Sequence, residues 1–255
     1  MHTWPHVPRR TFFTAALLAG SVAGLSSAAW GQETARTEYL YEGVLGNSTI
    51  GMTLLQPRSG DARLTGHYFH GKALKDIALT GTLQGHQLVL REPGGATFAL
   101  QLVGQGQESG KPPAFASSVG LSGVWTQGAR RLDVTLGNTA SRAAGGRRYA
   151  QVTSESDAEF EARVQAFHRA VLAGQRAEAL RFVDFPLRVS QGGKTREIAS
   201  AEQLEAGWTQ VFTRACLDLL KEALPHDMFV ANGQAMLGSG AVWFGANGAV
   251  AINLP

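Results

Sequence analysis

The sequence predicts an α+β protein built from two parts, and three observations support this prediction. Residues 39–136 alternate apolar and polar side chains between glycine-bearing turns, which is the period of half-buried strands. Residues 156–223 repeat apolar side chains at helical intervals, apart from one hairpin. After Pro225 the strand period returns in short segments separated by Asn-Gly and Gly-Ser-Gly turns. A block of strands followed by helices and a second sheet is typical of α+β proteins.

Residues 1–31 form a predicted export signal. The run Arg9-Arg10-Thr11-Phe12-Phe13 precedes a mild apolar stretch, and small residues follow it up to Gly31. This order is typical of a cleavable signal peptide, and the run resembles bacterial twin-arginine signals. Pro8 and Thr14 depart from that pattern, so the general secretory route stays open as an alternative. An uncleaved anchor is disfavoured because the apolar stretch is short and rich in Ala, Gly and Ser. We expect a periplasmic or secreted protein without stable membrane insertion.

Charge and cysteine content exclude several classes of protein. Removal of the signal's two arginines lowers the net charge from +3 to +1, which is not the balance of a nucleic-acid partner. The small basic cluster of Arg142, Arg147 and Arg148 is interpreted as a solvated linker. Cys216 is the single cysteine, so no internal disulfide can form, and its apolar helical surroundings predict a buried thiol.

Residues 32–137 form a predicted antiparallel β domain of about eight strands, a barrel or a sandwich. A closed sheet of this size is either filled by side chains or holds one small ligand, and we favour the filled form. Gly66, Gly81 and Gly123 fall inside strand patterns and are expected to mark bends. His67 and His70 would point to opposite faces of a strand, which disfavours a metal site. Residues 138–155 lack an apolar period and are predicted to be a flexible linker.

Residues 156–255 form the predicted second domain. A capping box at Ser156 opens a helix that Gly174 ends, and a short helix runs into Pro186. Gly192-Gly193 marks a hairpin, and a second capping box at Ser200 opens another helix. A further helix covers 215–223, and strands are expected at 228–230, 234–237, 241–244 and 249–254. The two Asn-Gly pairs, at 232–233 and 247–248, suit tight primed turns.

This order of elements resembles the NTF2-like superfamily over residues 156–255. The resemblance also lies in residues 182–189 and 236–244, which are similar to segments of exported bacterial proteins of unassigned role. It implies a cone in which a curved sheet wraps a helix, often around an apolar pocket. Some members are isomerases, dehydratases or hydrolases, and others only bind or assemble, so the fold alone does not choose a function.

The candidate site residues follow from the pocket that this resemblance implies. An acid or histidine beside apolar walls could act in catalysis, and Asp184, His226 and Asp227 are the weak catalytic candidates. Arg188, Trp208 and Trp243 are the candidates for ligand binding. Each has a structural alternative: a turn hydrogen bond for Asp184, a polar connection for His226-Asp227, a solvated strand face for Arg188, and the core for both tryptophans. The late strands carry no acid or histidine, which weakens the case for an enzyme.

We therefore expect an exported binding protein without cofactor or metal. Its ligand would be a small apolar molecule, or its partner an envelope protein. The first alternative is an isomerase or hydrolase that uses the C-terminal pocket, and the second is a structural or immunity-type interaction protein. Phosphate-loop and nucleophile-elbow motifs are absent from the sequence.

Overall fold

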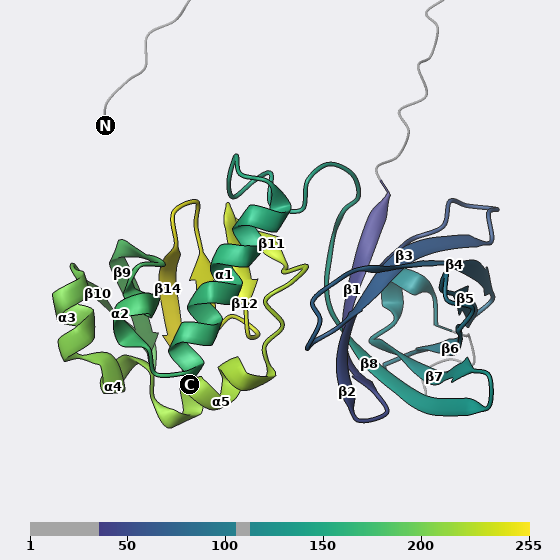
Figure 1. The fold of residues 1–255 in the computed structure, drawn as a ribbon. Coiled ribbons are helices and arrows are strands. Elements are labelled where there is room, and N and C mark those ends of the chain that lie inside the picture. The colour runs from purple at the N-terminus through teal and green to yellow at the C-terminus, as the bar shows by residue number, and fades with distance from the viewer. Residues whose placement is uncertain (1–35, 106–112) are drawn as a thin grey trace, which may run out of the picture. The chain divides into compact units, whose positions relative to one another are not determined.

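A computed structural model describes residues 36–105 and 113–255, which belong to one compact unit. The predicted export signal lies outside these residues, as does the start of the predicted β domain. Among the described residues, no helix is both long enough and apolar enough to cross a bilayer. The fold is mixed α+β, as predicted, with a β-barrel followed by helices and a second sheet (Figure 1).

The first part is a closed antiparallel barrel in which each strand pairs with the next and β1 pairs with β8. This finding decides between the barrel and the sandwich. A short helix of three residues, Phe115–Ser117, precedes β7. The strands are β1 (Thr37–Leu45), β2 (Ser48–Leu55), β3 (Arg63–His70), β4 (Ile77–Gln84), β5 (Gln87–Arg91), β6 (Thr97–Val103), β7 (Gly120–Gln127) and β8 (Arg130–Ala143).

Side chains fill the barrel, which is the form that the sequence favoured. Met52 and Leu54 of β2 alternate inward as predicted, and Tyr41, Tyr68 and Phe98 occupy the same interior. The rings of Tyr68 and Phe98 meet edge to face with centroids 5.0 Å apart. The volume that a ligand would need inside an eight-stranded barrel is therefore taken by protein atoms.

The glycines inside the strand patterns allow neighbouring strands to approach closely. A Cβ at Gly66, Gly81 or Gly123 would lie 2.1, 1.9 or 2.1 Å from a carbonyl oxygen of the adjacent strand. No side chain fits at such a distance, so these positions let the sheet coil tightly enough to close.

The boundary predicted at residue 138 falls inside β8. Residues 138–143 pair with β1, from Asn138 opposite Tyr41 to Ala143 opposite Thr37, instead of forming a linker. The apolar period ends at Leu136 because the half-buried positions beyond it hold Asn138, Ala140 and Arg142 and the positions between them are exposed. A connection without helix or strand remains only between Ala143 and α1.

The second part begins with helices and continues as a sheet. The helices are α1 (Asp157–Leu172), α2 (Arg176–Leu180), α3 (Ala201–Ala206), α4 (Trp208–Val211) and α5 (Arg214–Glu222). The strands are β9 (Val183–Gln191), β10 (Lys194–Ile198), β11 (Val230–Ala231), β12 (Gln234–Leu237), β13 (Val242–Phe244) and β14 (Ala249–Leu254). The order along the chain agrees with the sequence prediction.

The capping box at Ser156 is present, because the serine and Glu159 exchange hydrogen bonds at the start of α1. At the second box Ser200 caps α3, but Gln203 accepts from the backbone N–H of Ala199 instead of that of Ser200. The helix predicted there is also interrupted, since Gly207 separates α3 from α4. Glycine has a low helix propensity, which favours a break at this position.

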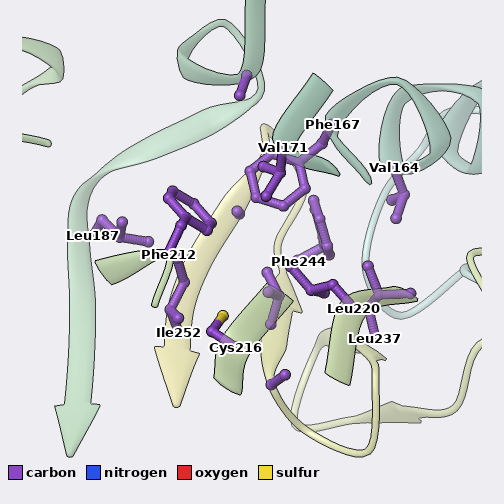
Figure 2. Packing of buried hydrophobic residues seen from close by; sticks show 14 of the residues in the cluster. Val164, Phe167, Val171, Leu187, Phe212, Cys216, Leu220, Leu237, Phe244 and Ile252 are labelled. Atoms are coloured by element: carbon purple, nitrogen blue, oxygen red, sulfur yellow. The ribbon is translucent and has the colours of Figure 1, made fainter. Parts of the chain in front are cut away.

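The six strands lie in the order β10-β9-β14-β13-β12-β11, and only β9 and β14 run parallel. Figure 1 shows α1 against this sheet. The core between helices and sheet is apolar, and Figure 2 shows Phe167, Phe212 and Phe244 within it, with Phe167 and Phe244 in edge contact at 5.2 Å. Cys216 is fully buried there, as predicted, and burial raises the pKa of its thiol to about 11.

One of the two predicted Asn-Gly turns is wrong. Asn232 and Gly233 both adopt positive φ, as a primed turn between β11 and β12 requires. Asn247 and Gly248 do not have positive φ. Gly248 serves a different purpose there, since a Cβ would lie 2.5 Å from the carbonyl oxygen of Phe182.

Candidate functional site

Two predicted catalytic candidates, His226 and Asp227, lie in a group of charged side chains that joins the barrel to the second part. We call this group the ion cluster. It combines residues of β3, the β3–β4 loop, β8, the connection before α1, α1 itself and the segment after α5. Its members are His67, Asp76, Arg142, Arg148, Glu161, His226 and Asp227.

Asp227 is the most enclosed member, with 5% of its surface exposed. Thr53 Oγ1 donates to its Oδ2 at 2.6 Å, and His67 Nε2 lies 2.8 Å from the same oxygen. Arg142 Nη2 and Arg148 Nε lie 2.8 and 3.2 Å from Oδ1. Burial alone would raise the pKa of Asp227, but the contact with His67 and the two guanidinium charges outweigh it and hold that pKa well below its ordinary range.

The backbone at Asp227 supports the same interpretation. Its φ is +48°, in the left-handed region that costs free energy for residues with a side chain but is tolerated best by Asn and Asp. Five polar contacts, the fifth being the hydrogen bond from its backbone N–H to Glu161 Oε1 at 2.9 Å, keep the residue in this conformation. The left-handed conformation therefore accompanies a carboxylate that pairs with Arg142 of β8 and with Arg148 of the connection before α1.

His226 lies between two carboxylates. Its Nε2 is 2.8 Å from Asp76 Oδ1, and its Nδ1 is 2.5 Å from Glu161 Oε2. Burial by itself would lower the pKa of His226, but Asp76 and Glu161 outweigh it and raise that pKa to about 9. The imidazole is therefore a cation at neutral pH. The ring of Phe69 meets it edge to face at 4.5 Å and covers it from the barrel side.

The acids around His226 are charged at neutral pH. Burial alone would raise the pKa of Asp76, but the hydrogen bond from His226 and the charges of His67 and Arg148 lower it to about 2. The pKa of Glu161 is lowered too, because the contacts with His226 and the backbone N–H of Asp227 outweigh burial. Tyr149 OH donates to Glu161 Oε1 at 2.7 Å, and burial raises its pKa well above the ordinary value.

These pKa shifts define what the ion cluster can do chemically. An efficient general acid or base has a pKa near the working pH. His226 is shifted upward, away from that range, and Asp76, Glu161 and Asp227 are shifted downward. The cluster is built of charged groups that pair with one another, which suits holding two parts of the chain together better than proton transfer.

The other predicted site residues lie elsewhere. Asp184 is half-buried on β9 and accepts from Asn247 Nδ2 at 3.3 Å, so it lies in a strand and bonds a distant loop instead of the local turn that the sequence suggested. Trp208 is buried in the core of the second part, where its ring packs 4.2 Å from that of Phe212. Arg188 and Trp243 come together on the sheet, in a shallow groove of about 260 Å³. Trp208 does not belong to that groove.

A larger cleft lies beside the ion cluster, and sequence reasoning missed it. The cleft has a volume of about 790 Å³ and is formed by the β1–β2 turn, the β3–β4 loop, α1 and the end of α5. We call it the basic cleft. Its lining includes basic side chains and histidines, namely Lys72, Arg169, Lys221, His70 and His168. It also includes the apolar residues Leu74, Leu224 and Pro225. No sequence pattern indicates it, because four distant segments each supply only a few residues.

The polar lining of the basic cleft carries an excess of positive charge. Lys72 and Arg169 are exposed and form no ion pair with any residue that the structure describes. Lys221 pairs with Asp218 at 2.8 Å, and Glu222 is the acid among the lining residues. Burial lowers the pKa of His168, so the ring is neutral at neutral pH and its Nε2–H donates to the carbonyl of Leu220 at 2.6 Å.

The ion cluster positions the walls of the basic cleft. Leu224 and Pro225 line the cleft directly before His226 and Asp227, and the β3–β4 loop contributes both cleft residues and Asp76. The loop approaches closely at Gly71, where a Cβ would lie 2.8 Å from Leu224 Cδ2. Leu74 in the same loop has a φ of +49°, a strained value for such a residue.

Comparisons with protein-family models, curated proteins and solved structures find no match for this chain.

Proposed function

We propose that this chain is an exported, periplasmic or secreted binding protein that takes a small amphipathic anion into the basic cleft. The observation that carries this proposal is the lining of the cleft, where cationic and histidine side chains face the same volume as an apolar group. A volume of about 790 Å³ falls within the range of small-molecule sites.

The cleft divides into two chemical regions. Lys72 and Arg169 have no ionic partner among the described residues, so an anionic group could pair with them without breaking an existing bridge. Leu74, Leu224 and Pro225 offer an apolar surface that would cover a hydrocarbon or ring. A ligand with a carboxylate or phosphate at one end and an apolar body would use both regions.

The two apolar cores are filled by side chains and leave no room for a ligand, which favours a site at a surface cleft. The interior of the barrel and the space between helices and sheet are both occupied by large apolar side chains. An apolar ligand inside either core would have to displace them, at the cost of well-packed contacts. The ligand that we propose is therefore amphipathic, in place of the purely apolar ligand that the sequence led us to expect.

We further propose that residues 156–255 form an NTF2-like cone. The order of helices, hairpin, helices and four strands supports this proposal, as does the packing of α1 against the sheet. In this chain the inside of the cone is filled, which is compatible with members that bind or assemble at other surfaces. Export by a twin-arginine-like or general secretory signal is also part of the proposal.

Isothermal titration calorimetry with the chain from residue 32 onward tests the binding proposal. The probes are decanoate, decanol and decyltrimethylammonium, which share an apolar body and differ in charge. We expect decanoate to bind at least about tenfold more tightly than the others, which corresponds to ~1.4 kcal/mol. The double variant Lys72→Gln/Arg169→Gln should remove this preference.

Arg188→Gln is the matched control, because it removes an exposed arginine from the sheet groove and leaves the basic cleft intact. Equal affinities for decanoate and decyltrimethylammonium would contradict the proposal. So would a decanoate preference that persists in the double variant.

A further inference from the structure

The sheet of the second part has one face away from the core, and the groove with Arg188 and Trp243 lies on it. Val189, Val242 and Ile252 point into the core, so their neighbours Arg188, Trp243 and Ala251 point to the other face. Ala251 pairs with Arg188 on β9 and with Trp243 on β13. The arginine and the indole therefore flank one small residue, with Cα atoms ~10 Å apart.

Arg188 is an exposed cation without an ionic partner among the described residues. Glu197 is its cross-strand neighbour on β10, yet the two form no ion pair in the described part of the chain. No acid is among the residues that line the groove. An anionic group could therefore approach the guanidinium along the groove. Glu197, opposite Arg188 on β10, is the carboxylate that would compete with it for the guanidinium.

The remaining lining offers hydrogen-bonding groups around an aromatic ring. Trp243 is half-buried, and its indole N–H and the amide of Gln234 have no partner within the described residues. Asn253 Nδ2 donates to the carbonyl of Gly240 at 2.7 Å, which orients the amide and leaves its oxygen available. The hydroxyls of Ser190 and Thr195 lie 2.9 Å apart at the same groove.

We propose that the sheet groove binds a sugar that carries a carboxylate, such as a hexuronic acid. The carboxylate would pair with Arg188, whose guanidinium matches it with two parallel hydrogen bonds. The apolar face of the sugar ring would lie against the indole of Trp243, and its hydroxyls would meet Gln234 and Asn253. The volume of about 260 Å³ suits one ring better than a larger ligand. This site is separate from the basic cleft and does not depend on the proposed function.

Nuclear magnetic resonance titration of the chain from residue 32 onward tests the inference, with the indole N–H signal of Trp243 as the reporter. The probes are D-glucuronate, D-glucose and benzoate. We expect glucuronate to shift this signal with an affinity about tenfold above that of the other two, since a charge-assisted hydrogen bond contributes ~1.5–3 kcal/mol. Trp243→Phe assigns the signal.

Three variants separate this site from a general effect of charge. Arg188→Gln should lower the glucuronate affinity about tenfold, to that of glucose. Arg196→Gln should leave it unchanged, because Arg196 is an exposed arginine on β10 whose register partner, Val189, faces the core. Glu197→Gln should raise it two- to threefold, roughly 0.5 kcal/mol, by removing a competing charge.

Equal binding of glucuronate to the Arg188→Gln variant would overturn the inference. Benzoate binding as tight as glucuronate would also overturn it, because that outcome would indicate an aromatic anion site. A shift that Arg196→Gln abolishes would show charge attraction without a defined site. None of these outcomes depends on the basic cleft.

Discussion

Replacement of Asp227 by Asn should destabilise the protein strongly. Asp227 is buried, and four side-chain contacts of 3.2 Å or less converge on its two oxygens. Asn has nearly the same shape and also tolerates positive φ, so this change removes the charge without adding backbone strain. The variant thus removes the charge and replaces one acceptor oxygen by a donor, while it keeps the shape of the side chain.

The expected loss of unfolding free energy depends on which ionic partners Arg142 and Arg148 keep in the variant. Arg142 and Arg148 are 15% and 19% exposed, and both would lose a partner. Arg142 keeps Glu38 at 2.7 Å, while Arg148 keeps Asp76 and a 3.5 Å contact with Glu161. Breaking a buried ion pair costs about 3–5 kcal/mol, and these remaining partners place the expected loss near ~3 kcal/mol.

Urea unfolding at pH 7 measures this loss, with circular dichroism and tryptophan fluorescence as separate probes. Asp218→Asn is the matched control, since Asp218 also pairs with two cations but is half exposed on α5. The control should lose about 0–1 kcal/mol. A loss below ~1 kcal/mol for Asp227→Asn would refute the reasoning, because it would show that the ion cluster contributes little.

Three further predictions concern single residues. His226 has a folded pKa of about 9, above its ordinary value, so its stabilisation is complete below pH ~6.5 and is lost as pH rises through about 9. Wild-type stability should therefore fall by up to ~3 kcal/mol over that range, and His226→Gln should show a flatter profile in urea unfolding. Gly81→Ala should cost ~2 kcal/mol or more, because its Cβ would lie 1.9 Å from Val89 O, whereas Gly94→Ala, with no atom within 4 Å, should be nearly neutral in the same assay. Cys216 should react with a thiol reagent at pH 8 only as fast as the chain opens, since it is buried and its pKa is about 11, and immediate labelling of the native protein would contradict its placement.

The elements of this fold were predictable because their signals are local. Alternation at Ile50, Met52 and Leu54 specifies a strand wherever that strand later pairs, and the capping box at Ser156 specifies a helix start. Closure of the barrel was open in the sequence, because the pairing of β1 with β8 joins residues about one hundred positions apart. Local patterns do not encode that pairing.

The ion cluster was not predictable for the same physical reason. A short basic run set among Ala and Gly is usually solvated, and this pattern gave the interpretation of Arg142 and Arg148 as part of a solvated linker. The structure corrects this, because their partners Asp76, Glu161 and Asp227 come from three other segments. The misplaced linker has a related origin. Residues 138–143 pair with β1, but Thr139, Ser141 and Ala143 are exposed and Arg142 pairs with acids, so this part of the strand lacks an apolar period.

The distribution of charge suggests why the two cores remain distinct. Each part buries its own apolar cluster. The contact between the two parts instead holds Asp227 and His226 together with their ionic partners, which include Arg142, Arg148 and Asp76. An apolar contact would stabilise many relative placements about equally, because hydrophobic burial is non-directional. Ion pairs between Arg142, Arg148 and Asp227 are satisfied only in one arrangement, at the cost of desolvation. The basic cleft is bounded by both parts, so its geometry depends on that arrangement. Asp227→Asn should therefore weaken decanoate binding even under conditions in which both cores stay folded, whereas Asp218→Asn should not.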